Sequence, residues 1–323
     1  MFTISQTDTQ AETLITVGQS SKSLHCVINL LILCKIFNFI LTLGDSITQS
    51  NRENFGYRYR LWTKLIDDSR SFDMVGSITY NFGGNPSWPQ HMGLNFDQDH
   101  EGHWGWRTDE ILNGRLAAGS LTEWLDYYTP DVVLIHLGTN DVYQNQSTTS
   151  TVEELKQVID MLRADNPDVI IFVAKLIPTA SSRNTGIIEL NAEMEGIAAL
   201  KSTAQSPVHV VDHYTGFDAI TDTYDGIHPN AVGEKKMAEN WNAAMWTYLN
   251  PCIDGFDNDN DGFIDFTADP DCTNPQGSEF PSCPGNSGPD NDLDGMDLAA
   301  YIADPSGATL ADFAAAFIRT DCP

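Results

Sequence analysis

The sequence predicts an α/β protein with a doubly wound, mainly parallel sheet and helices on both faces of it. Short runs of apolar and β-branched residues alternate with longer segments in which apolar residues recur every three or four positions. The first pattern is typical of buried strands and the second of amphipathic helices. This alternation favours a layered α/β fold, in which functional groups gather beyond the carboxyl ends of the strands.

The expected elements follow one another between residues 37 and 249. Strands are predicted over Phe37–Leu43, Phe72–Gly76, Asp131–Leu137, Val169–Ala174 and Val208–Val211. Helices are predicted over Phe55–Asp68, through Ile111, Leu112 and Leu116, from a capping box at Thr151 through Leu162, over Ile187–Leu200 and over Ala231–Leu249. The segment Asn81–Asn95 is rich in Gly and Pro and has no sustained period, which indicates a long loop, and such loops are often functional.

The composition divides the chain into a core-forming part and an acidic tail. Of 323 residues, 45 are acidic and 17 basic, and Arg319 is the only basic residue after Pro251. The formal net charge of -28 repels phosphate backbones, so no nucleic-acid partner is expected. We expect an N-terminal segment over 1–35, disordered or wrongly assigned, a catalytic domain over 36–250, an Asp-rich module over 251–282 and a partial repeat over 283–323.

Cysteine usage indicates an oxidising location. Four of the six cysteines lie in the acidic tail, whose short Gly- and Asp-rich segments have little core of their own. Disulfides are therefore expected there, which predicts a protein that is secreted or at the cell surface, with free thiols as the alternative. Three pairings are possible, and we favour the sequential one because each pair brackets one module: Cys252 with Cys272, and Cys283 with Cys322.

The N-terminal region gives no independent sign of export. Residues 26–34 are apolar enough for the hydrophobic part of a signal peptide, but the segment before them is too long and too polar. A membrane helix over Cys26–Leu43 would contain Lys35 and Asn38 and would consume the first expected strand. We therefore expect no transmembrane segment.

A serine stands at the end of that first strand. Ser46 follows the apolar run Phe37–Leu43, and Gly44 allows the backbone to turn sharply between them. A serine hydroxyl becomes a strong nucleophile only when a base takes its proton and donors receive the charge that develops on the substrate. The rest of the chain supplies candidates for both, in a usable order.

The candidate base, a candidate donor and a further polar residue lie in three later segments. His228 precedes the last expected helix and can take the Ser46 proton, while Asp225 can orient its ring. Gly105 is expected at the start of a helix, where a free N–H can bind a substrate oxygen, and Asn140 follows the third strand. Each fragment alone is weak and a structural histidine is the plain alternative, but their joint, ordered appearance favours catalysis.

His100, Glu101 and His103 offer a competing interpretation as a metal site. Zinc proteases carry both histidines on one helical face in the order H-E-x-x-H, whereas these two are three residues apart in a Gly-rich loop. We therefore expect catalysis to need no metal or other cofactor.

These motifs resemble the four sequence blocks of the SGNH, or GDSL-type, hydrolases over about residues 36–250. The blocks are Gly-Asp-Ser-Ile-Thr around Ser46, the Gly in His-Glu-Gly-His-Trp-Gly-Trp, Gly-Thr-Asn-Asp around Asn140, and Asp-Gly-Ile-His-Pro around His228. The resemblance implies a three-layer flavodoxin-like fold and ester hydrolysis. It also implies Ser46 as nucleophile, His228 as base with Asp225 as its partner, and Ser46, Gly105 and Asn140 as oxyanion donors. The second block is similar to that of carbohydrate esterase family 3, the acetylxylan esterases.

That similarity implies an acetylated polysaccharide, or another small-acyl ester, as the substrate. Trp104, Trp106 and Tyr143 lie near the expected active-site loops, where sugars can stack on aromatic rings, although rings that merely pack on the core are as good an explanation. Lipid esters, the substrates of lysophospholipase-type esterases, are the competing class. A second class of function is an attachment protein with a weak hydrolase domain, which the complete set of motifs disfavours.

The strongest metal-binding pattern lies in the tail, at Asp257, Asp259, Asp261 and Asp265. Oxygen ligands on alternate residues, with Gly262 at the sixth position, suit a calcium loop, although a twelfth-position Glu is missing. We expect Ca²⁺ here, with a solvated linker as the alternative. A looser run over 290–297 resembles a dockerin repeat whose second calcium loop is missing, and this resemblance implies a cohesin-like or cell-surface partner.

Overall fold

The computed structural model describes residues 38–248, apart from 69, 71 and 116–117, and four short strands nearer the N-terminus. The chain divides into two compact units, one of residues 37–242 and the other of residues 1–36 with 243–323. The second unit contains an antiparallel sheet that was not predicted, with strands β1 (Ile4–Gln6), β2 (Thr13–Ile15), β3 (Cys26–Ile28) and β4 (Ile32–Leu33). The predicted disulfides, calcium loop and partial repeat of the tail lie outside the described residues.

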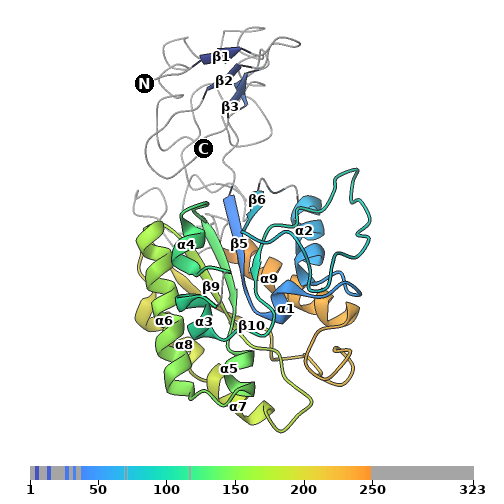
Figure 1. The fold of residues 1–323 in the computed structure, drawn as a ribbon, viewed down its shortest axis with the longest axis vertical. Coiled ribbons are helices and arrows are strands. Elements are labelled where there is room, and N and C mark those ends of the chain that lie inside the picture. The colour runs from blue at the N-terminus through green and yellow to red at the C-terminus, as the bar shows by residue number, and fades with distance from the viewer. Residues whose placement is uncertain are drawn as a thin grey trace, which may run out of the picture. The chain divides into compact units, whose positions relative to one another are not determined.

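A parallel sheet forms the middle layer of the 37–242 unit (Figure 1). Its main strands are β5 (Asn38–Gly44), β6 (Phe72–Val75), β8 (Val132–His136), β9 (Ile170–Lys175) and β10 (Val208–Asp212). They lie in the order β10-β9-β8-β5-β6, which is the flavodoxin-like arrangement, and the short β7 (Glu101–Gly102) pairs in parallel with the last two residues of β5. All the pairs are parallel, so the predicted α/β fold is confirmed.

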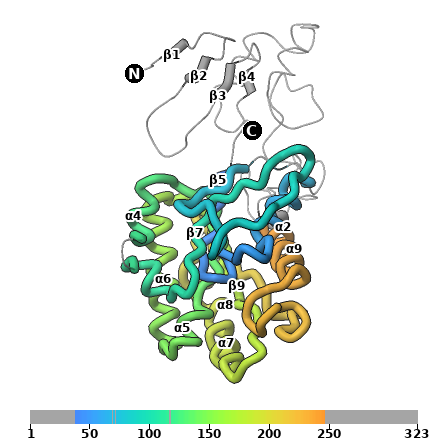
Figure 2. The backbone as a smooth tube through the Cα atoms, turned by 45° about the vertical axis from the view of Figure 1, so that its right-hand side comes forward, coloured from blue at the N-terminus to red at the C-terminus, as the bar shows by residue number. Residues whose placement is uncertain are grey.

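Helices cover both faces of this sheet, as Figures 1 and 2 show. One face carries α3 (Thr108–Asn113), α4 (Leu121–Leu125), α6 (Thr148–Asp165), α7 (Asn184–Asn191) and α8 (Met194–Lys201). The other carries α2 (Tyr57–Asp67) and α9 (Ala231–Tyr248). Because successive strand residues point to opposite faces, Leu41 and Val133 join the core under α6, while Ile40 and Leu134 are buried on the α2 and α9 side.

Two helix boundaries differ from the predictions. Ser147 caps α6 by accepting a hydrogen bond from a backbone N–H of its first turn, whereas a capping box was predicted at Thr151. Thr151 is instead buried inside the helix, and its hydroxyl donates to Asp141. The single helix predicted over Ile187–Leu200 is divided into α7 and α8. Among the described residues, no helix is both long enough and apolar enough to cross a bilayer.

Candidate active site

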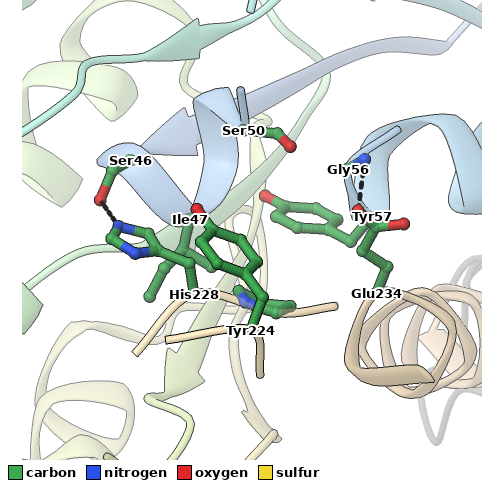
Figure 3. A pocket seen from close by; sticks show the side chains of 9 residues that line it. Ser46, Ile47, Ser50, Gly56, Tyr57, Tyr224, His228 and Glu234 are labelled. Carbon is green, nitrogen blue, oxygen red and sulfur yellow. Dashed lines mark hydrogen bonds between the residues drawn. The ribbon is translucent and has the colours of Figure 1, made fainter. Parts of the chain in front are cut away.

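Ser46 is the first residue of α1 (Ser46–Gln49), which follows directly on the carboxyl end of β5 (Figure 3). The turn between them requires Gly44, because a Cβ there would lie 2.1 Å from the Thr48 Oγ1 atom and 2.8 Å from the His136 carbonyl oxygen. Asp45 caps α1, since its Oδ1 accepts a hydrogen bond of 2.9 Å from the Ile47 N–H. The strand, turn and cap together fix Ser46 at the carboxyl end of β5.

The structure brings the three predicted catalytic side chains into one hydrogen-bonded line. His228 Nε2 lies 2.9 Å from Ser46 Oγ (Figure 3). On the other side of the ring, His228 Nδ1 lies 2.7 Å from Asp225 Oδ2. The other oxygen of Asp225 accepts hydrogen bonds from the N–H groups of Ile227 (3.0 Å) and His228 (2.8 Å). The carboxylate therefore holds both the ring and the backbone of His228, which directs Nε2 at the serine hydroxyl.

The charge of Asp225 is suited to this role. Partial burial acts to raise the pKa of its carboxyl, but the hydrogen bonds from the His228 backbone and ring outweigh burial and hold the pKa below its ordinary value. The carboxylate is thus ionised near neutral pH and can stabilise a positive imidazolium beside it.

Three groups were predicted to receive the negative oxygen of a tetrahedral intermediate, namely the Ser46 and Gly105 N–H groups and the Asn140 amide. Gly105 was predicted at the start of a helix, but it lies in the turn before α3. Its φ is 79°, and the space where a Cβ would stand is open. Within the described part of the chain, neither the Ser46 N–H nor the Gly105 N–H donates to a protein acceptor. The Asn140 amide donates one hydrogen to the Trp106 carbonyl oxygen at 2.9 Å, which leaves the other free to donate.

Two hydrogen bonds tie the Gly105 turn to the nucleophile segment. The His103 N–H donates to the Gly44 carbonyl at 2.9 Å, and the Trp104 N–H donates to the Gln49 Oε1 atom at 2.9 Å. Gln49 is buried and is the last residue of α1. Sequence reasoning missed this positioning role, because an isolated Gln within the nucleophile motif has no pattern that links it to a distant loop.

The aromatic residues predicted to bind substrate have different locations. Trp104 is half-buried beside His228, whereas Trp106 is buried in the core, so a stacked sugar cannot reach the Trp106 ring. The Tyr143 hydroxyl bonds to the hydroxyls of Thr179 and Ser181. Of the three, only Trp104 contacts a member of the catalytic line, with its ring centroid 4.8 Å from that of His228.

The residues of the competing metal-site interpretation, His100, Glu101 and His103, are packed in the protein interior. His100 is fully buried; its Nδ1 accepts from the Gly102 N–H, and burial lowers its pKa well below the ordinary value. Glu101 and His103 form a buried pair at 2.8 Å, and the His103 ring stacks on Trp124. Both ring nitrogens of His100, both carboxylate oxygens of Glu101 and the Nε2 of His103 already bond to protein groups, so these side chains are components of the core.

One acidic cluster in the described ranges has carboxylates close enough to share an ion, namely Asp109, Asp141 and Glu154. Its charges have protein partners, because Arg107 forms two hydrogen bonds with Asp109 and the Thr108 N–H donates to Asp141. The cluster is therefore explained without a metal.

A small pocket adjoins Ser46 and His228 (Figure 3). Ser50, Tyr57 and Tyr224 also line it, and its volume is about 10 Å³. A space of this size holds about one water molecule.

The buried carboxyl of Asp45 leads to a prediction about stability. Complete burial raises its pKa from 3.8 to about 7, so the folded state favours the neutral form while the unfolded chain ionises near pH 3.8. The stability that the neutral carboxyl contributes is complete below pH 3.8 and is lost as the pH rises towards 7. The free energy of unfolding of Asp45→Asn, relative to that of the wild type, should therefore increase by up to about 4 kcal/mol as the pH rises from 4 to 8.

Urea unfolding of both proteins at several pH values measures this gain. Asp97 and Asp141 also have raised pKa values, so only the difference between wild type and variant isolates Asp45. A difference that stays constant across this range would show that Asp45 does not titrate as described.

A nucleophilic serine, an imidazole and a carboxylate at the carboxyl edge of a parallel sheet, with N–H donors beside the serine, define a serine hydrolase domain. Comparison with known protein families identifies the family of this domain. The chain belongs to the GDSL-like Lipase/Acylhydrolase family, which matches residues 42–236.

Individual relatives are similar to this domain and not to the whole chain. A multidomain esterase of Ruminococcus flavefaciens is 29% identical over 229 residues, which are 65% of this chain and 28% of that protein. A crystal structure of a carbohydrate esterase family 3 protein from Talaromyces cellulolyticus is 32% identical, covers 65% of this chain and 96% of its own, and has a TM-score of 0.56. An acetyl esterase crystallised as a mutant with an acetate ion is 31% identical, with the same coverage and TM-score.

Proposed function

We propose that this protein is a serine esterase that removes acetyl groups from an acetylated plant polysaccharide such as acetylxylan. The observation that carries the proposal is the hydrogen-bonded line from Ser46 through His228 to Asp225. Such a line activates a hydroxyl for attack on an acyl carbon, and the free N–H groups of Ser46 and Gly105 lie on the segments tethered beside it.

The reaction follows from the atoms in place. Ser46 Oγ bonds to the ester carbonyl carbon while its proton passes to His228 Nε2. The carbonyl oxygen takes the negative charge and is received by the N–H groups of Ser46 and Gly105 and by the Asn140 amide. The sugar hydroxyl leaves with the proton from His228, and a water that loses its proton to His228 then releases acetate and restores Ser46.

Similarity to named relatives supports a short acyl group and a sugar alcohol over the alternative of a lipid ester. The relatives that share the domain carry the names multidomain esterase, carbohydrate esterase family 3 and acetyl esterase.

The test is acetate release from acetylated xylan, measured beside aryl esters of increasing acyl length. We expect release from xylan and a steep loss of turnover beyond acetyl. Turnover only of long-chain aryl esters would move the substrate class to lipids, and no turnover of any ester would reject the catalytic assignment.

For the tail, the proposal rests on the sequence alone. The spacing of Asp257, Asp259, Asp261 and Asp265 supports Ca²⁺ binding, and the tail cysteines support a secreted or cell-surface location. Resemblance to a dockerin repeat supports a cohesin-like or cell-surface partner.

We expect EDTA to lower the temperature of a melting transition and excess Ca²⁺ to restore it, because an ion that binds only the folded tail stabilises it. Turnover of an aryl acetate at low temperature should not change, since the proposed chemistry uses no metal. Identical calorimetric scans with and without EDTA would contradict calcium binding.

A further inference from the structure

Four aromatic rings form a continuous stack across the active site. Phe82 lies 4.5 Å from Trp104, Trp104 lies 4.8 Å from His228, and His228 lies 5.6 Å from Tyr224, measured between ring centroids. The interplanar angles are 20°, 15° and 12°, so the rings are close to parallel. The stack therefore joins the irregular loop over 81–95 to the catalytic base.

The position of a ring in this stack decides what it can bind. Trp104 packs against two near-parallel rings, Phe82 and His228, so its half-buried indole is already engaged by protein rings. Phe82 is an end ring and is 51% exposed. Tyr224, at the other end, is 45% exposed, but it lines the small pocket and its hydroxyl accepts a hydrogen bond from Asn51. Phe82 is thus the end ring that is not committed to that pocket.

The backbone of Phe82 is fixed to the segment that follows the nucleophile. Its N–H donates to the Ser50 carbonyl at 3.0 Å, and its carbonyl accepts from the Arg52 N–H at 3.1 Å. Ser50 is in turn the C-cap of α1, and its N–H donates to the Ser46 carbonyl at 2.8 Å. The exposed ring is therefore preorganised relative to Ser46, and little conformational entropy is lost when a ligand covers it.

We propose that the outer face of Phe82 is a carbohydrate-binding subsite, which stacks on a sugar neighbouring the acetylated residue; this inference rests on the proposed function. One face of a pyranose presents mainly C–H groups, and an exposed aromatic ring gives that face an apolar partner. The centroid spacings of 4.5 Å from Phe82 to Trp104 and 4.8 Å from Trp104 to His228 place the subsite beyond the sugar that carries the ester, on the same polymer chain. The subsite adds affinity for a polymer and little for a small aryl acetate.

Steady-state kinetics of Phe82→Ala, Phe82→Tyr and Tyr127→Ala on acetylated xylan and on an aryl acetate test this assignment. Tyr127 is a matched control because it is an aromatic residue that is 83% exposed. It precedes β8 and so lies near the amino ends of the parallel strands, whereas Ser46 follows a carboxyl end. Phe82→Ala should raise KM for xylan by about tenfold, the effect of one aromatic contact, and should change the aryl acetate constants much less. Phe82→Tyr should restore the xylan KM, and Tyr127→Ala should match the wild type.

The outcomes separate this inference from the proposed function. If the wild type and Phe82→Ala release acetate from xylan with the same KM, the subsite is rejected and the esterase stands. If Phe82→Ala lowers kcat on both substrates alike, Phe82 only supports Trp104 and His228, which also rejects it. If the wild type releases no acetate from xylan, the proposed substrate is rejected. The subsite is then tested by measuring the affinity of an acetylated xylo-oligosaccharide for Ser46→Ala and for the double variant that also carries Phe82→Ala. Equal affinities would reject the subsite.

Discussion

Ser46→Ala should lower kcat for every ester by on the order of 10⁴-fold or more, because the hydroxyl that would form the acyl-enzyme is absent. The substitution removes a single oxygen whose hydrogen-bond partner is the His228 ring, and Ala is compatible with the start of a helix. We therefore expect an intact fold. Acetate release under substrate saturation measures the loss, and circular dichroism and thermal melting verify the fold.

The matched control is Ser120→Ala, which removes a serine hydroxyl before α4 that makes no capping hydrogen bond. Its turnover should equal that of the wild type. If Ser46→Ala retained appreciable turnover, another group would be the nucleophile, and the line from Ser46 to His228 would be structural.

Asn140→Ala should lower kcat by about 10²- to 10³-fold with a smaller effect on KM. The amide would donate to an oxygen that becomes negative only in the transition state, so its loss costs more there than in the ground-state complex. Its contact with the Trp106 carbonyl fixes the amide in place before substrate binds. Initial rates across a range of aryl acetate concentrations separate kcat from KM.

Asn113→Ala is the control for this variant, because Asn113 is an exposed residue at the end of α3 whose amide bonds only to a local carbonyl. It should leave both constants unchanged. A raised KM with an unchanged kcat in Asn140→Ala would show that Asn140 binds substrate uniformly and does not stabilise the intermediate.

The position of the site could be predicted from the order of elements. Ser46 and Asn140 each follow a buried apolar strand, and His228 lies in the loop after the last one. Parallel strands place their carboxyl ends at one edge, so residues far apart in the chain meet there. The short spacing from Asp225 to His228 likewise predicted a local pair, because three residues of loop suffice to fold one side chain onto the other.

The destinations of the loop side chains were decided only by the tertiary structure. Trp104 and Trp106 flank Gly105 and look equivalent in the sequence, yet one stacks on His228 and the other enters the core. Their separation depends on the turn at Gly105, with its φ of 79°, and on the hydrogen bond that holds the Trp104 N–H on Gln49. An irregular loop has no period that assigns side chains to a face, so contacts with distant segments must do so.

The sequence by itself therefore determined the fold class, the strand-end location of the site and the order of Ser46, Asp225 and His228. Only the tertiary structure decided that Asp45 is buried, that Gln49 holds the Gly105 turn, and that Phe82 and not Trp104 presents an open ring. The physical reason is range: periodic hydrophobicity and turn residues act over a few positions, whereas burial and ring stacking join segments that meet only when the sheet is complete.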